Sequence, residues 1–313
     1  MIDEQVLTNL KQRFGSRVKE NAGISAFCTA QTGGEVDALL VVNNRQELQD
    51  AVVSLWQNNV PFKVLGAGSN VLVADQGYRG VILINRAKAY KIDAETASPV
   101  LWAESGANLG GLARQAAIQG LSGLEWAGTV PGTLGGAVYG NAGAHGGDMA
   151  DNLILADILH HDEKISAWDA SQMGFQYRSS ILKRGAEKAV ILSATLRLKH
   201  STREQVTDLM NQYQEKRRQS QPPGASMGSM FKNPAGDYAG RLLEAAGLKG
   251  TRVGGVEISP VHANFFINVG SATAADIYQL ICHARQQVFD RFGVQLELEI
   301  ELLGNFPAVQ LSD

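Results

Sequence analysis

The sequence predicts an α+β protein of about two domains. Short apolar segments typical of strands alternate with longer segments of helical periodicity, and the 313 residues exceed the usual size of one domain. A run containing proline and glycine at residues 221–224 interrupts these patterns and marks a domain edge. We expect a first domain at residues 1–203, with subdomains at about 1–85 and 86–203, and a second domain at residues 204–313.

The first subdomain begins with a helix and continues with a strand–helix–strand unit. Val6, Leu10 and Phe14 recur at helical spacing, whereas the strands are short, uninterrupted apolar runs. Pro61 follows the end of the second helix. The predicted elements are helix 5–14, strand 38–42, helix 45–58, strand 62–65, an extended segment at 71–73 and strand 81–84.

The second subdomain combines strands with a glycine-rich centre. A helix rich in small residues precedes the glycines, and Thr202 with Gln205 fits the capping box that starts a further helix. The predicted elements are strand 100–104, helix 108–119, the glycine-rich run 120–147, short strands within 153–160, strand 189–198 and a helix from 202 to about 218.

The C-terminal residues end in an alternating segment. Thr273 and Asp276 form a predicted capping box before the longest helix of this region. The predicted elements are helix 239–246, strand 263–268, helix 274–292 and a final strand at 296–302. In that strand Glu297, Glu299 and Glu301 alternate with apolar residues, so they would share one face, most simply a solvent-exposed one.

Composition excludes several classes of protein. With 28 basic and 31 acidic residues the net charge is −3, so the charge of a strongly basic nucleic-acid binder is missing. No apolar run approaches the ~18 residues of a membrane span, and no signal-peptide pattern is visible. Cys28 and Cys282 have no cysteine partner at metal-ligand spacing. We expect a cytoplasmic protein that has no disulfide bonds and binds no metal. We expect neither nucleic acid nor a membrane as its partner.

The turn at residues 66–70 is a candidate phosphate cradle. It follows a strand, so its main-chain N–H groups can face an anion. It lacks the third glycine of a G-x-G-x-x-G fingerprint, and an extended segment follows it, which excludes a Rossmann interpretation. No Walker A sequence is present either. A tight turn without a ligand is the alternative.

The second glycine-rich segment, residues 128–147, favours ligand contact more strongly. Ordering glycine costs more backbone entropy than ordering any other residue. That cost is reasonable where the main chain itself lies against a large flat or charged ligand. A flexible surface loop is the alternative, but the segment carries Val130, Leu134, Val138 and Tyr139 and almost no charge.

Candidate catalytic residues are few. Ser226 lies in a G-x-S-x-G pattern, but the strand and helix that a nucleophile elbow requires are not predicted around it, which argues against a serine hydrolase. Ser229, Lys232 and Asn233 lie within five positions, a polar cluster suited to an anionic substrate; a polar loop is the alternative. Arg178 is ambiguous in its own sequence context.

Six motifs occur in order along the chain: residues 65–73, 123–126 continuing at 131–137, 141–143, 177–180, 228–234 and 262–265. Together they resemble the UDP-N-acetylenolpyruvoylglucosamine reductase family, flavoenzymes of peptidoglycan precursor synthesis. The resemblance extends from about Thr32 to Gly304. The family's Thr-Thr-Phe-x-x-Gly-Gly pattern is matched only at its end, at Gly33 and Gly34.

The resemblance implies a fold and a cofactor. Family members have the FAD-binding fold shared with vanillyl-alcohol oxidase and p-cresol methylhydroxylase, followed by an α+β substrate-binding domain. They bind FAD non-covalently and without a Rossmann fingerprint. The chain resembles the shorter type, which lacks an extra tyrosine-bearing loop. The FAD-binding positions implied in this chain are Gly66, Ala67, Gly68, Ser69, Asn70, Pro131, Gly132, Thr133, Gly135, Gly136, Asn141 and Gly143.

The resemblance also implies a two-stage reduction. NADPH, the co-substrate, reduces FAD, and the enolpyruvyl ether of UDP-N-acetylglucosamine then accepts a hydride at its vinyl C3 and a proton at C2. The family's catalytic residues fall on Arg178, Ser229 and Glu299, and its substrate-contacting loop on Lys232 and Asn233. The partners are then NADPH and a UDP-sugar, and no obligate protein partner is implied.

Two other functions remain open at this point. An FAD-linked oxidase of the same fold would act on an alcohol or an amine, but it gives no reason for the polar cluster that includes Ser229 and Lys232. A non-catalytic FAD- or nucleotide-binding module is the third possibility. Consumption of NADPH that requires the enolpyruvyl substrate would separate the three.

Overall fold

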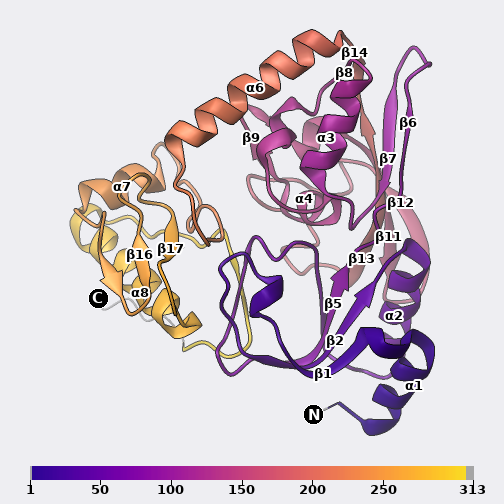
Figure 1. Ribbon diagram of the computed structural model, residues 1–313, viewed down its shortest axis with the longest axis horizontal. Helices are drawn as coiled ribbons and strands as arrows, with labels where there is room; N and C mark the ends of the chain where they lie inside the picture. Colours follow the sequence, from indigo (N-terminus) through magenta and orange to yellow (C-terminus); the bar gives the residue numbers. More distant parts are fainter. Residues whose placement is uncertain (1, 308–313) are drawn as a thin grey trace.

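The first sheet has four strands in the order β1-β2-β5-β3 in the computed structural model, which describes residues 2–307 (Figure 1). β2 and β3 both run parallel to β5, so the predicted strand–helix–strand unit is present but β5 lies between its two strands. Helices α1 and α2 bury Leu10, Leu48 and Leu55 against this sheet. The elements are α1 (Glu4–Phe14), β1 (Val18–Gly23), β2 (Glu35–Val42), α2 (Arg45–Gln57), β3 (Phe62–Leu65), β4 (Val71–Val73) and β5 (Tyr78–Asn85).

The second sheet has five antiparallel strands in the order β12-β11-β13-β7-β6. Helices α3 and α4 pack against it around a core that includes Leu101, Leu112 and Leu196. The elements are β6 (Tyr90–Asp93), β7 (Val100–Glu104), α3 (Leu109–Ile118), β8 (Leu121–Ser122), α4 (Leu134–Gly140), β9 (Gly143–Ala144), β10 (Gly147–Asp148), α5 (Met149–Asn152), β11 (Leu153–His160), β12 (Ile165–Trp168), β13 (Ala189–Arg197) and β14 (Lys199–His200).

The glycine-rich segment within this region is ordered, so the flexible-loop alternative is wrong. Residues 134–140 form α4, whose N-cap Thr133 accepts a hydrogen bond from the Gly136 N–H. Leu134 and Val138 are buried in the core of the second sheet. After α4 the chain forms the short hairpin β9–β10. The apolar residues of the segment therefore anchor it, and its glycines lie on a fixed framework.

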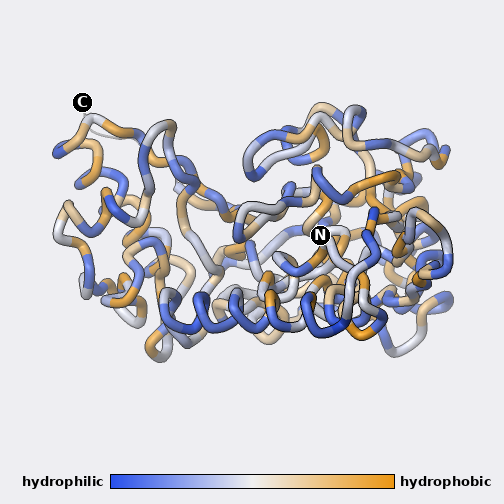
Figure 2. Tube along the Cα trace, turned by 90° about the horizontal axis from the view of Figure 1, so that it is seen from above, coloured by the Kyte–Doolittle hydropathy of each residue, from blue (hydrophilic) through white to orange (hydrophobic). Residues whose placement is uncertain are grey.

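The third sheet, β15-β16-β17, packs against helices α7 and α8. α8 starts at the predicted capping box, in which Thr273 and Asp276 each bond the main chain of the other. Helix α6 runs along the outside from the β8–β14 pair towards α7 and is mostly hydrophilic (Figures 1 and 2). The elements are α6 (Arg203–Ser220), α7 (Ala239–Ala245), β15 (Arg252–Val253), β16 (Val256–Ile258), β17 (Phe266–Asn268), α8 (Ala274–Phe292) and β18 (Glu301–Leu303).

The alternating C-terminal segment is a regular strand only at its end. The Glu299 N–H donates to the Met230 carbonyl at 2.9 Å, whereas the Glu301 N–H donates to the Asn70 carbonyl at 2.9 Å. β18 then pairs in parallel with β4, far away in the sequence. The prediction of one continuous strand at 296–302 is therefore wrong. The segment changes partners midway and so connects the loop around residue 230 with the first glycine segment.

Candidate active site

The two predicted glycine segments lie against each other. A Cβ atom added at Gly66 would collide with the side chain of Thr133, so the two main chains approach closely there. The Ser69 hydroxyl donates a hydrogen bond to the Pro131 carbonyl at 3.3 Å, and a Cβ at Gly132 would lie 3.3 Å from Ser69 Oγ. Residues 66–70 and 131–136 thus form one surface, as a shared ligand requires.

Open space borders this surface on the α4 side. A Cβ added at Gly136 would meet only Thr133 Oγ1, at 3.6 Å, and one added at Gly140 would meet no atom of residues 2–307 within 4 Å. The main chain at these glycines is therefore accessible to a large flat or anionic group. The Gly136 N–H donates to Thr133 Oγ1, so what these glycines offer to a dinucleotide such as FAD is close approach to the main chain.

A third segment, residues 28–34, completes the surface and was not included among the predicted binding residues. The Thr29 N–H donates to the Gly68 carbonyl at 3.1 Å, which packs this segment against the first glycine loop. The hydroxyl of Thr32 is buried, and its oxygen has no hydrogen-bond partner among residues 2–307. The incomplete N-terminal motif match, ending at Gly33 and Gly34, was the only sequence signal for this segment.

The side chain of Asn141 is fully used within the protein. Its Oδ1 accepts from the Ala150 N–H at 3.0 Å, and its Nδ2 donates to the Gln176 carbonyl at 3.1 Å and to Asp148 Oδ2 at 3.3 Å. Asn141 adopts φ +45°, a left-handed conformation that ends α4. Any cofactor contact of Asn141 would therefore come from its main chain, while its side chain fixes the loop that precedes Arg178.

Arg178 and Glu299, predicted from distant parts of the chain, form an ion pair. The Arg178 Nε donates to Glu299 Oε1 at 3.0 Å, and its Nη2 donates to the Gly143 carbonyl at 2.6 Å. The guanidinium also lies over the ring of Tyr177, 5.2 Å from its centroid. Arg178 has φ +55°, a conformation that costs of order 1–3 kcal/mol for a residue other than glycine and is concentrated at functional sites.

The Glu297 side chain is exposed, whereas Glu299 and Glu301 are both partly buried, so the expectation of one solvated glutamate face is wrong. Burial raises the pKa of the Glu299 carboxyl, while the nearby cations Arg178, Lys183 and Lys232 act in the opposite direction. Arg178 is bonded to Oε1, and within residues 2–307 no donor is bonded to Oε2. That oxygen is therefore available to carry a proton.

Two further groups hold the main chain at Glu299. The Asn70 side-chain amide donates to the Glu299 carbonyl at 3.0 Å, and the Lys183 ammonium donates to the same oxygen at 3.3 Å. Asn70 thus connects the first glycine loop directly to the catalytic candidate. Lys183 was not predicted; it follows Arg178 by five positions, and no periodicity or motif marks it.

Ser229 reaches the same site through its main-chain neighbours. Ser229 pairs with Phe265, and the carbonyl of the next residue, Met230, accepts from the Glu299 N–H at 2.9 Å. The Ser229 hydroxyl forms no hydrogen bond with the residues that the structure describes. The segments that contain Ser229 and Arg178 therefore both contact Glu299, although the three residues are far apart in the sequence.

Lys232 and Asn233 continue this loop. The Lys232 ammonium pairs with Glu297 Oε2 at 3.1 Å, and its N–H donates to the Glu297 carbonyl at 2.9 Å. The Asn233 Oδ1 accepts from the Ala239 N–H at 3.1 Å and so fixes the start of α7. Lys232 contributes to the positive potential at Glu299. Together with Arg178 and Lys183 it places three cationic groups around Glu299.

The described part of the chain contains no group of His, Cys, Asp and Glu side chains arranged to hold a metal ion. Among residues 2–307, no helix has the length and apolarity that crossing a membrane requires.

Comparison with known proteins first defines the class. A family profile described as "FAD binding domain" matches residues 36–166, and one described as "UDP-N-acetylenolpyruvoylglucosamine reductase, C-terminal domain" matches residues 217–303. The protein is therefore a flavoprotein, an FAD-dependent oxidoreductase. The predicted fold class, an FAD-binding fold followed by an α+β domain, is confirmed. More narrowly, the chain belongs to the UDP-N-acetylenolpyruvoylglucosamine reductase family.

Individual relatives support the assignment over nearly the whole chain. The reductase of Chloroflexus aggregans is 38% identical over 94% of this chain and 100% of its own length. The reductase of Bacillus subtilis is 36% identical over 96% of this chain and 99% of its own. The crystal structure of UDP-N-acetylenolpyruvylglucosamine reductase from Thermus caldophilus superimposes with a TM-score of 0.78 at 35% identity, covering 92% of this chain and 99% of that one.

Proposed function

We propose that the protein reduces the enolpyruvyl ether of UDP-N-acetylglucosamine to UDP-N-acetylmuramate, with NADPH as the electron source, in the cytoplasmic synthesis of peptidoglycan precursors. The observation that carries the proposal is the Arg178–Glu299 pair. It lies where the first glycine loop, through Asn70, meets the polar loop that contains Ser229 and Lys232. The proposed cofactor surface and a substrate site with three cationic groups would thus share one catalytic centre.

The glycine segments and residues 28–34 would hold non-covalent FAD. Bound FAD supplies hydride transfer, taking two electrons from NADPH and delivering a hydride to the vinyl C3 of the substrate. Gly136 and Gly140 offer accessible main chain beside residues 66–70, and the orphaned hydroxyl of Thr32 is a further candidate contact. This arrangement leaves Arg178, Ser229 and Glu299 for the chemistry at the substrate.

Addition of hydride at C3 develops negative charge on C2 and the adjoining carboxylate. The Arg178 guanidinium would stabilise this enolate-like charge directly. A bare carboxylate beside the enolate would repel it, so Glu299 would act in its protonated, hydrogen-bonding form, which burial favours by raising its pKa. Ser229, whose hydroxyl is unbonded among residues 2–307, would then protonate C2.

Residues 204–313 would form the substrate-binding domain, with Lys232 and Asn233 in the loop that contacts the UDP-sugar. Lys232 is a cation of this loop that acts on Glu299, and Asn233 fixes the loop to α7. An FAD-linked oxidase of the same fold was the alternative. The relatives and the solved structure named above are reductases, so that alternative is not favoured.

The purified protein is expected to be yellow, and acid precipitation should release the flavin into the supernatant. Anaerobic NADPH should bleach it, and addition of the enolpyruvyl substrate should restore the colour. Steady-state NADPH consumption should depend on that substrate. Colourless protein that cannot be reconstituted with FAD would contradict cofactor binding. Reoxidation by oxygen alone, with no response to the enolpyruvyl substrate, would instead indicate an oxidase.

A further inference from the structure

Lys183 is a half-buried cation with an unusual set of neighbours. Its ammonium donates one hydrogen bond, to the main-chain carbonyl of Glu299 at 3.3 Å. Within residues 2–307 no carboxylate oxygen lies within 4.0 Å of it, so it has no ion-pair partner. An unpaired, partly buried ammonium is energetically unfavourable, and burial lowers the pKa of Lys183 accordingly. Such a residue calls for an explanation at the site that it faces.

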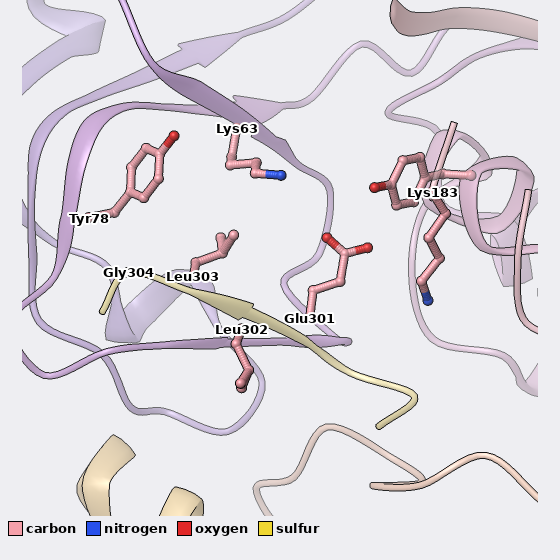
Figure 3. Close-up of a pocket in the computed structure, with 8 residues that line it drawn as sticks. Lys63, Tyr78, Lys183, Glu301, Leu302, Leu303 and Gly304 are labelled. Carbon is pink, nitrogen blue, oxygen red and sulfur yellow. The ribbon is translucent and has the colours of Figure 1, made fainter. Parts of the chain in front are cut away.

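The Lys183 side chain lines a cavity of about 370 Å³ (Figure 3). Lys63 on β3, Tyr139 on α4 and Glu301 on β18 line the same cavity. Glu301 favours the charged form of Lys183, and burial together with Glu301 raises the pKa of Tyr139. The cavity that Lys183 lines is therefore bordered by β3 and α4 from the first part of the chain and by β18 from the C-terminal part.

The charges around Glu299 come from three elements. Arg178 and Lys183 approach it from the segment after β12, and Lys232 approaches from the polar loop; all three favour its ionised form. On its own segment, Glu301 acts on Lys183, while Glu297 is held by Lys232. Because Arg178 and Lys232 are each bonded to a carboxylate, Lys183 is the cation of this group whose charge is not neutralised by an ion pair.

We propose that Lys183 is a positioning residue of the reductive step, fixing the main chain at Glu299 and supplying the unpaired positive charge that controls whether its carboxyl is charged. The proposal rests on the proposed function of Glu299. Asn70 donates to the same carbonyl, so the hydrogen bond has a second support. Arg178 and Lys232 also act electrostatically on Glu299, but each of them is bonded to a carboxylate, and Lys183 is not.

The sign of the effect follows from simple electrostatics. A nearby cation stabilises the carboxylate, so removing it raises the pKa of Glu299. The protonated form, which acts in the reductive step, then persists to higher pH. The rate of substrate reduction should fall on the alkaline side of its pH profile, and this decline is the alkaline limb. In Lys183→Met the limb should move to higher pH by about 0.5–1 pH unit, as expected for loss of one cation several ångströms away.

The experiment uses flavin-loaded enzyme reduced by NADPH and mixed rapidly with the enolpyruvyl substrate over a series of pH values. Lys183→Met should shift the limb and also lower the plateau rate. Lys183→Gln keeps a donor for the Glu299 carbonyl, so it should shift the limb with little loss of plateau rate. Lys183→Arg keeps the charge and should leave the limb in place. If Lys183→Met fails to fold, Lys183→Gln carries the same test.

Lys63→Met is the matched control. Lys63 lines the same cavity but is not one of the cations that act on Glu299, so its loss should leave the limb unmoved. A limb that stays in place in Lys183→Met and Lys183→Gln would overturn the proposal. An equal shift in Lys63→Met would also overturn it, because the effect would then be a general one of cavity charge.

Glu299→Gln separates failure of this proposal from failure of the proposed function. If Glu299 is the group that titrates, its replacement should abolish the limb. A limb and rate unchanged in Glu299→Gln would contradict the role of Glu299 itself. A limb that Glu299→Gln abolishes and Lys183→Gln does not move would contradict only the role of Lys183.

Discussion

In Ser229→Ala, NADPH should still bleach the bound flavin at a near-normal rate, while reoxidation by the enolpyruvyl substrate slows by ~10²–10⁴-fold. This is the usual contribution of a positioned general acid, about 3–5 kcal/mol of barrier. The hydroxyl is needed only when C2 is protonated, so only the second half-reaction should respond. Rapid mixing of reduced enzyme with substrate, followed at the flavin absorbance, measures the effect.

The structure supports this separation. Ser229 is joined to Glu299 through the Met230 carbonyl, yet its own hydroxyl has no partner among residues 2–307. Removing that hydroxyl therefore breaks no hydrogen bond within the described chain, and the fold should be preserved. A serine is a weak acid in water, so its role depends on the fixed position that pairing with Phe265 provides.

Ser226→Ala is the internal control. Ser226 lies in the same loop and carries the rejected nucleophile-elbow pattern, but its neighbour Ala225 pairs with Asn268 at the end of β17, away from the Glu299 contact. Its substitution should be mild in both half-reactions. Should Ser226→Ala prove the damaging change and Ser229→Ala the harmless one, the assignment of the proton donor would be wrong.

Local signals predicted the elements well where they are strong. α8 begins at its capping box because Thr273 and Asp276 satisfy each other's N–H groups within four residues, and both are visible in the sequence. The order of the first sheet was not predictable in this way. β5 lies between β2 and β3 because of tertiary pairing, and the sequence of a strand does not show which strands will pair with it.

The choice among three glutamates shows the same limit at the site. Alternation alone makes Glu297, Glu299 and Glu301 equivalent, and only the family resemblance selected Glu299. In the structure the difference arises from a change of hydrogen-bond partners, first Met230 and then Asn70, which turns Glu299 towards Arg178. Such contacts join positions about 70 and 230 residues apart, too distant for a local pattern to reveal.

The glycines divide into two kinds that sequence spacing does not separate. Gly68 has φ +61°, and a Cβ there would collide with the Phe27 carbonyl, so the fold itself requires glycine. Gly136 lies in α4 with ordinary helical geometry and has open space on its outer side. Loss of flavin in Gly68→Val would therefore be ambiguous, whereas Gly136→Val tests the cradle directly.

Gly136→Val should abolish flavin retention while leaving the protein folded. The added Cβ meets only Thr133 Oγ1 at 3.6 Å, so the branched side chain occupies the space beside residues 66–70 without disturbing the core. The main chain that would contact the FAD pyrophosphate is then covered. We expect colourless protein with unchanged secondary structure by circular dichroism, and no recovery of flavin absorbance on incubation with FAD.

Gly23→Val is the matched control for this change. Gly23 lies at the end of the edge strand β1, and a Cβ there also meets no atom of residues 2–307 within 4 Å. Both substitutions replace glycine by valine in open space, but only Gly136 belongs to the surface formed by residues 66–70 and 131–136. Gly23→Val should keep its full flavin content. Full retention in Gly136→Val would show that this side of α4 does not face the cofactor, and equal loss in both would assign the effect to stability.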